Sequence, residues 1–483
     1  MKNEGIEMRR NGMLLPIASL PSPYGIGGFS KEAYEFIDLL EETGQKLWQI
    51  LPLGPTSYGD SPYQSFSTFA GNPYFIDLDT LAEKGWLTKE ACEASDYGDN
   101  ESYIDYGRIY NSRFVLLKQA FLNSDILSDE KFTEFCKANQ HWLPDYALYM
   151  ALKNQNDGKS WIEWEEEIRL RKPEAVEYYK KELEEECNFY EFLQYEFHEQ
   201  WTKVKEYAHE KGIQIVGDVP IYVAFDSADT WANPELFQLD EKNLPLGVAG
   251  CPPDAFSATG QLWGNPLYNW AYHKKTGYDW WLKRIAYCFD LYDIVRIDHF
   301  RGFDEYYSIP YGDETAVNGH WEKGPGMDLF NTVKEKLGEL DIIAEDLGFL
   351  TESVFQLLKD SGYPGMKVLQ FAFDPSEDSD YLTYKYQRNC VVYTGTHDND
   401  TTAGWFEKLS DGDKEVALRY MNSFYTPKEE QHWDLIALAM RSTADTCIIP
   451  VQDFLGLGSE ARINMPSTLG DNWKWRMTKG AFS

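Results

Sequence analysis

Three acidic residues follow strand-like apolar segments at distant points of the chain. Asp298 ends the run D-I-V-R-I-D, Glu345 stands in A-E-D-L-G, and Asp398 stands in T-H-D-N-D. Asp298 shares its strand face with Arg296, because successive residues of a strand alternate faces. The arginine predicts a lowered pKa for Asp298, whereas a partly buried Glu345 beside that charge should have a raised pKa. Two carboxyl groups whose pKa values differ in this way suit the cleavage of a glycosidic bond, which needs one nucleophile and one acid.

Other interpretations of these residues remain open at this point. A single aspartate at a strand end often forms a turn, and Arg296 with Asp298 is equally well a structural ion pair. Carboxylates at strand ends also bind Mg²⁺ in enolase-type barrels. Against a metal site, Arg296 and His299 crowd the first carboxylate, and no lysine lies near the strand ends as an obvious base. The His-Glu pair at 198–199 begins like a zinc-binding helix but lacks the second histidine of H-E-x-x-H.

The elements that must position these carboxylates are short, nearly continuous apolar segments, which is the pattern of strands buried on both faces. Amphipathic segments such as 30–43 and 279–291 lie between many of them and predict helices. Eight such units predict a (β/α)8 barrel, in which active sites form at the carboxyl ends of the strands. The predicted strands are 13–18, 46–52, 213–218, 293–298, 341–345, 367–373, 391–395 and 446–451.

A barrel of this type needs roughly 250 residues, so about half of this 483-residue chain must be insertions. We expect one compact unit over 1–483. A largely helical subdomain is expected at 55–195, after the second strand. A loop-rich subdomain is expected at 219–278, after the third strand, where it should cover the active site.

Composition excludes several classes of partner. The net charge of −34 repels nucleic acid and anionic membranes, so we expect neither as a partner. No apolar run reaches the length of a membrane span. Seven cysteines without a C-x-x-C pair indicate free thiols, and we therefore expect a cytoplasmic protein. The 16% of aromatic residues suggests a binding cleft in addition to a core.

Seven motifs in consistent order resemble the 4-α-glucanotransferase family, also called amylomaltases or disproportionating enzymes. V-R-I-D-H-F-R-G or A-E-D-L-G alone would suggest only the wider α-amylase clan, but seven motifs in order are specific. They are P-S-P-Y-G-I-G (21–27), D-S-P-Y-Q-S-F-S-T-F-A-G-N-P-Y (60–74), G-D-V-P-I-Y-V-A-F-D-S-A-D-T-W-A-N-P-E-L-F (217–237), P-P-D-A-F-S-A-T-G-Q-L-W-G-N-P-L-Y (252–268), V-R-I-D-H-F-R-G (295–302), A-E-D-L-G (344–348) and T-H-D-N-D (396–400).

The resemblance implies a double displacement on α-1,4-glucans, with donor and acceptor sugars as partners and with no cofactor or metal. It implies that Asp298 is the nucleophile, that Glu345 is the acid and base, and that Asp398 stabilises the transition state. The positions that match the family's sugar contacts and supporting groups are Ser61, Tyr63, Asp218, Asp254, Gln261, Trp263, Arg296, His299, His397 and Asn464. A glucan-binding protein with a dead site would need a missing carboxylate, and all three are present.

Overall fold

A parallel sheet of eight strands forms the centre of the computed structural model, which describes residues 9–57, 59–253, 257–348, 350–376 and 378–482. The strand order is β10-β11-β12-β1-β2-β3-β6-β9. The Ala344 N–H donates to the Pro364 carbonyl at 2.9 Å between the two end strands, which closes the sheet into the predicted (β/α)8 barrel. The barrel strands are β1 (Arg10–Leu14), β2 (Leu47–Gln49), β3 (Gln214–Pro220), β6 (Ile294–Asp298), β9 (Ile342–Ala344), β10 (Gly365–Val368), β11 (Cys390–Tyr393) and β12 (Thr446–Pro450).

Each of the eight predicted segments overlaps one of these strands, although the boundaries differ, most of all at the first, second and sixth strands. The first strand was expected at 13–18 but ends at Leu14. Pro16 has no N–H to give to a strand ladder, and a 3-10 turn follows it. The sixth strand was expected to reach residue 373, but a 3-10 turn begins at Leu369.

One apolar cluster fills the barrel interior, and every barrel strand contributes at least one residue to this cluster. Every member is at most 2% exposed, so the inward faces of the strands pack as a core and leave no pore. The buried members are Leu14, Leu47, Val216, Ile294, Ile343, Met366, Val391, Tyr393 and Ile448. This core holds the strand ends, and hence the carboxylates that follow them, in register.

Helices surround the barrel and follow most of its strands. The helices predicted at 30–43 and 279–291 are present; Ser30 stands at the N-cap of α1, and its hydroxyl donates to Glu32 at 2.6 Å. The helices that flank the barrel are α1 (Lys31–Glu42), α12 (Asp279–Leu291), α13 (Met327–Leu337), α14 (Glu352–Ser361), α15 (Thr402–Lys408), α16 (Asp411–Met421), α17 (Gln431–Arg441) and the short α18 (Val451–Phe454) after the last strand.

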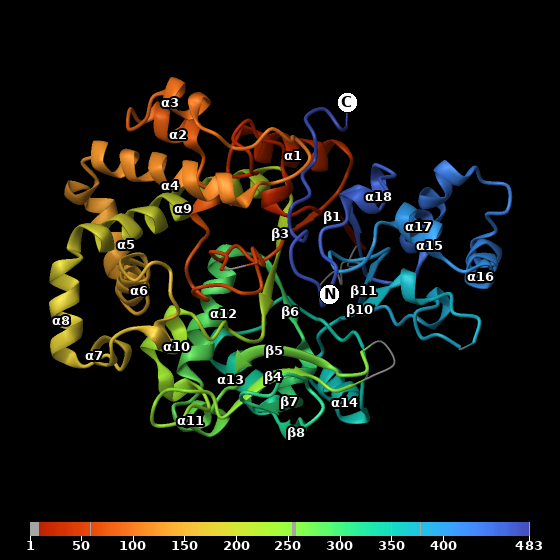
Figure 1. Cartoon of the computed structure of the whole chain (residues 1–483). Coiled ribbons are helices and arrows are strands. Elements are labelled where there is room, and N and C mark those ends of the chain that lie inside the picture. Colours follow the sequence, from red (N-terminus) through yellow and green to blue (C-terminus); the bar gives the residue numbers. More distant parts are fainter. Residues whose placement is uncertain (1–8, 58, 254–256, 349, 377, 483) are drawn as a thin grey trace, which may run out of the picture.

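The chain between β2 and β3 is helical in the part that the structure describes. Its helices form a group at the left of Figure 1, on the side of the barrel away from α15–α17. They are α2 (Leu78–Glu83), α3 (Lys89–Ala94), α4 (Tyr106–Asn123), α5 (Glu130–Ala138), α6 (Leu143–Gln155), α7 (Glu166–Arg169), α8 (Pro173–Glu182) and α9 (Glu184–Glu210).

A second, antiparallel sheet lies beside the barrel, and the sequence analysis did not anticipate it. The segment between β3 and β6 supplies two of its strands together with α10 (Ala228–Ala232) and α11 (Trp270–Lys275). Its order is β5-β4-β7-β8, with β4 (Gly247–Cys251), β5 (Gln261–Pro266), β7 (Glu305–Pro310) and β8 (His320–Lys323). Because β7 follows β6 closely, this sheet is connected directly to the end of the strand that carries Asp298.

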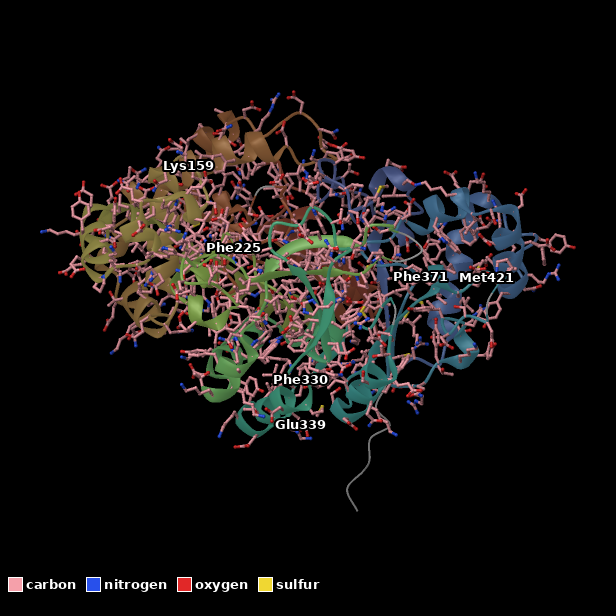
Figure 2. All side chains as sticks on the ribbon, turned by 60° about the horizontal axis from the view of Figure 1, so that its bottom comes forward. Lys159, Phe225, Phe330, Glu339, Phe371 and Met421 are labelled. Carbon is pink, nitrogen blue, oxygen red and sulfur yellow. The ribbon has the colours of Figure 1, made fainter. Side chains whose placement is uncertain are left out.

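Side chains fill the spaces between these parts. In Figure 2, Lys159 and Phe225 lie on the side of the helical insertion, Phe371 and Met421 lie on the opposite side, and Phe330 lies among the helices between them. None of the helices in the described ranges combines the length and the apolar character needed to cross a membrane.

Candidate active site

The three predicted carboxylates follow three parallel strands of the barrel. Asp298 is the last residue of β6, Glu345 directly follows β9, and Asp398 lies five residues beyond the end of β11. Parallel strands end on the same side of the sheet, and the register places Ile297 beside Ala344. The barrel therefore brings together residues that are up to a hundred positions apart in the sequence.

Arg296 is buried between two carboxylates. Its Nη1 lies 2.7 Å from both carboxylate oxygens of Asp218 and 3.0 Å from Oδ1 of Asp298. Arg296 is 2% exposed and Asp218 is 1% exposed, so this pair is almost free of water. A buried charge is tolerated only when it is paired, and here each charge has a partner.

The predicted pKa of Asp298 was wrong in direction. Burial raises the pKa of Asp298 to about 6, although the charge of Arg296 opposes this shift. Arg296 was predicted to pair with Asp298 alone, but it is shared with Asp218, whose own charge also raises the pKa of Asp298. Desolvation therefore outweighs the ion pair.

Glu345 is held by the backbone that follows Asp298. Its Oε2 accepts the His299 N–H and its Oε1 accepts the Leu347 N–H, each at 2.7 Å. His299 has a φ of 51°, a left-handed conformation that is uncommon outside glycine and here directs the N–H toward Glu345. Burial and the neighbouring charge of Asp298 raise the pKa of Glu345 to about 7, as the sequence analysis expected.

Asp398 has the opposite electrostatic character. Burial would raise its pKa, but His397 at 3.3 Å and the Asn464 amide, which donates to Oδ1 at 2.6 Å, hold the pKa well below its usual range. Although burial opposes it, the charge of Asp398 raises the pKa of His397. Asp398 is thus fixed as an anion beside two carboxyl groups that protonate more easily.

A cavity of about 650 Å³ opens over these groups. Nine of the predicted site residues line it, and they come from five separate parts of the chain. They are Ser61, Tyr63, Gln261, Trp263, Asp298, His299, His397, Asp398 and Asn464. Asp218 and Arg296 lie buried behind Asp298. Glu345 does not line the cavity itself but accepts the backbone N–H of His299, which does. The predicted contact Asp254 lies outside the described residues.

Aromatic rings form the walls of the cavity. Tyr63 stacks on His397 with 5.2 Å between ring centroids and 17° between planes, and its hydroxyl donates to Asp218 at 2.8 Å. Trp263 and His299, which also line the cavity, lie perpendicular to each other with 4.8 Å between ring centroids. Flat apolar faces beside hydrogen-bonding groups match the surface of a sugar ring.

Several residues that line the cavity were not predicted from the sequence. Trp473 lies 5.7 Å from Tyr63, and Tyr222 lies 6.2 Å from Trp263, measured between ring centroids. The loop 466–469 also lines the cavity. The excess of aromatic residues was the available signal, but nothing in the sequence separates a ring in a cleft from one in a core. In the part of the chain that the structure describes, no group of three or more His, Cys, Asp and Glu side chains is arranged to hold a metal ion.

Comparisons with known proteins agree with this geometry. A family model described as 4-alpha-glucanotransferase matches residues 15–481. The chain is 54% identical over 469 residues to a 4-alpha-glucanotransferase of Clostridium butyricum, which covers 97% of this chain and 96% of that protein. A solved amylomaltase of Streptococcus agalactiae in complex with acarbose has a TM-score of 0.95 and 43% identity, covering 98% of this chain and 96% of that chain. An amylomaltase of Corynebacterium glutamicum, at 19% identity and a TM-score of 0.79, covers 97% of this chain and 71% of that chain and shares its fold.

Proposed function

This chain belongs to the 4-alpha-glucanotransferase family, as its sequence motifs indicated, and from that premise we propose a retaining double displacement on maltooligosaccharides. In this reaction a segment of α-1,4-glucan passes from a donor to the enzyme and then to an acceptor sugar. The observation that carries the proposal is the set of three carboxyl groups with separated pKa values at one end of the barrel. The similarity of the S. agalactiae amylomaltase, which is solved with acarbose, supports a sugar ligand in the corresponding cavity.

Asp298 is the proposed nucleophile. With a pKa of about 6 it is mostly ionised near neutral pH, and it lines the cavity while Arg296 fixes one of its oxygens. Its free oxygen attacks the anomeric carbon, the bond to the leaving glucan breaks, and a covalent glycosyl-enzyme forms.

Glu345 is the proposed acid and base. With a pKa of about 7 it still holds a proton in about half of the molecules at neutral pH, and in the first step it gives this proton to the departing glycosidic oxygen. In the second step the glutamate removes the proton from the acceptor hydroxyl, which attacks the anomeric carbon and releases Asp298. One residue serves both steps because the pKa of about 7 lies close to the working pH.

Asp398 is proposed to stabilise the oxocarbenium-like transition state through the sugar hydroxyls. Its depressed pKa keeps it anionic while the other two groups exchange protons. We propose that the other cavity residues bind sugar rings, with His299 and His397 beside the cleaved bond. Both inserted segments would then contribute to the cleft, since Ser61 and Tyr63 come from 55–195, and Gln261 and Trp263 come from 219–278.

Transfer in place of hydrolysis requires that a sugar hydroxyl, and not water, reaches the covalent intermediate. We propose that sugar stacked between the aromatic walls excludes water from Asp298. We also propose that the enzyme works in the cytoplasm, since the buried thiols of Cys92, Cys288, Cys390 and Cys447 suit a reducing compartment.

The proposal is tested by incubating the protein with maltotriose, with and without a chelator, and separating the products. Transfer gives glucose together with a ladder of longer maltodextrins, whereas hydrolysis gives only shorter products. Asp298→Asn should fold normally and produce neither. Retained turnover in Asp298→Asn would remove the nucleophile assignment, and activity lost in chelator and restored by Mg²⁺ would favour the metal-dependent alternative.

A further inference from the structure

The guanidinium of Arg296 is held from two directions. Its Nη1 binds the carboxylates of Asp218 and Asp298, as described above. Its Nε, on another part of the guanidinium, donates to the thioether sulfur of Met366 at 3.4 Å. Met366 is 1% exposed and belongs to the cluster in the barrel interior. Contacts from two directions fix the plane of the guanidinium, which a single ion pair would leave free to rotate.

A thioether is well suited to this position. An aliphatic side chain would leave the buried Nε–H without an acceptor, which is costly in a site without water. A carboxylate would accept the proton strongly, but it would compete with Asp298 for the charge of Arg296. Sulfur is a weak, neutral acceptor on an apolar and adaptable side chain. It satisfies the Nε–H and leaves the positive charge to the two aspartates.

We propose that Met366 is a positioning residue for the reaction: its sulfur orients Arg296 so that Nη1 bridges Asp218 and Asp298. The inference rests on the proposed role of Asp298 as nucleophile. Met366 does not line the cavity and touches no substrate, so its effect passes through Arg296. An Arg296 released from the sulfur would turn away from Asp298 and leave the carboxylate less stabilised and less well aimed.

Met366 is itself fixed at the seam of the barrel, where β9 meets β10. Its backbone N–H donates to the carboxylate of Asp346 at 2.6 Å, and Asp346 directly follows Glu345. Gly365 allows this approach, because a Cβ at that position would lie 2.4 Å from Oδ2 of Asp346. The residue next to the proposed acid therefore anchors the side chain that positions the proposed nucleophile.

The test is Met366→Leu, which keeps the apolar volume and removes the acceptor. We expect kcat for maltotriose to fall about tenfold, which is the loss expected when one buried hydrogen bond is misaligned. KM should change by less than about twofold, because the substrate contacts remain. The acidic limb of the pH profile should move to higher pH, since Asp298 loses part of its stabilisation. Met366 does not titrate, so the limb reports on the charged groups around Asp298, namely Arg296, Asp218, Asp398, His397 and Glu345.

Two further variants separate positioning from folding. Met13→Leu makes the same change at a buried methionine of β1 outside the barrel interior, and should keep both kcat and the pH profile. Met366→Gln restores an acceptor of similar length, and its kcat should return to within about threefold of the wild type. All variants are compared by thermal unfolding.

The outcomes are distinct. With Asp298→Asn inactive, the positioning role is overturned if Met366→Leu keeps the wild-type pH profile and kcat. It is also overturned if the kcat of Met366→Gln is no higher than that of Met366→Leu. An active Asp298→Asn overturns both the proposed function and this inference. If Met366→Leu does not fold, Met366→Gln decides the question, since a folded Met366→Gln with a shifted pH profile and a kcat lower by about tenfold would contradict the inference.

Discussion

The interior of the barrel and its mouth are built from the same strands but follow opposite chemistry. On β6, Ile294, Arg296 and Asp298 alternate with the outward residues and so share one face. Ile294 is fully buried in the apolar cluster, whereas the side chain of Asp298 is 29% exposed to the cavity. Between Ile294 and Asp298, the same face of the strand changes from part of the apolar core to a reactive group.

The two regions therefore contribute differently to stability and to activity. The interior is stabilised by close packing, so a deletion there should lower stability and leave the reactive geometry intact, except at Met366, which contacts Arg296. At the mouth, partial burial without full charge compensation raises the pKa of two carboxyl groups, which costs stability and makes the chemistry possible. Substitutions in the two regions should therefore separate activity from stability.

The largest effect is expected at the mouth, from Glu345→Gln. This variant keeps the shape of the side chain but cannot donate or accept the proton, so kcat for maltotriose should fall by about 10²–10⁴-fold. A donor whose leaving group needs no proton, such as α-maltosyl fluoride, should lose much less in its first step. Steady-state and burst kinetics with both donors measure this difference, and equal losses with the two donors would contradict the role of Glu345 as acid.

The interior gives the second prediction. Leu47 is fully buried on β2, a strand that carries none of the three carboxylates. Leu47→Ala should lower the free energy of unfolding by about 2–5 kcal/mol because it leaves a cavity. Chemical unfolding measures this loss, and the folded variant should keep kcat within about threefold. A loss of kcat without a loss of stability would contradict the division between interior and mouth.

The sequence predicted the interior more completely than the mouth. Apolar segments located all eight strands, because strands buried on both faces leave a continuous pattern. The three carboxylates were found because they follow those segments. The second sheet was missed because its strands carry Gly, Pro and polar residues in place of a continuous apolar run. The prediction for the pKa of Asp298 was wrong because the sequence does not show how deeply Asp298 is buried or that Asp218 shares Arg296. Long-range pairing and desolvation arise only when the chain is folded.

The third prediction concerns stability and pH at the mouth. Folding raises the pKa of Glu345 to about 7, so the carboxyl favours folding at low pH and this contribution is lost as pH rises toward and through 7. Glu345→Gln removes the titration. Its free energy of unfolding, relative to the wild type, should therefore increase by on the order of 1–2 kcal/mol between about pH 5 and pH 8. Denaturant unfolding at the two pH values measures this change, and a pH-independent difference would contradict the raised pKa.

The smallest effects are expected when one of two tyrosine hydroxyls is removed, one at the mouth and one in the interior. The Tyr63 hydroxyl donates to Asp218 at the mouth, and the Tyr393 hydroxyl donates to Gln49 in the interior, each at 2.8 Å. Each Phe variant loses one hydrogen bond, which contributes about 0.5–1.5 kcal/mol.

The two losses should appear in different measurements. In Tyr63→Phe the ring still stacks on His397, but Asp218 then draws Arg296 away from Asp298, so kcat should fall about threefold. In Tyr393→Phe the loss should appear in the unfolding free energy, with kcat unchanged. If both variants lose only stability, Tyr63 is part of the stabilising core. Asp218 would then belong to the interior, and the mouth would begin nearer to the cavity.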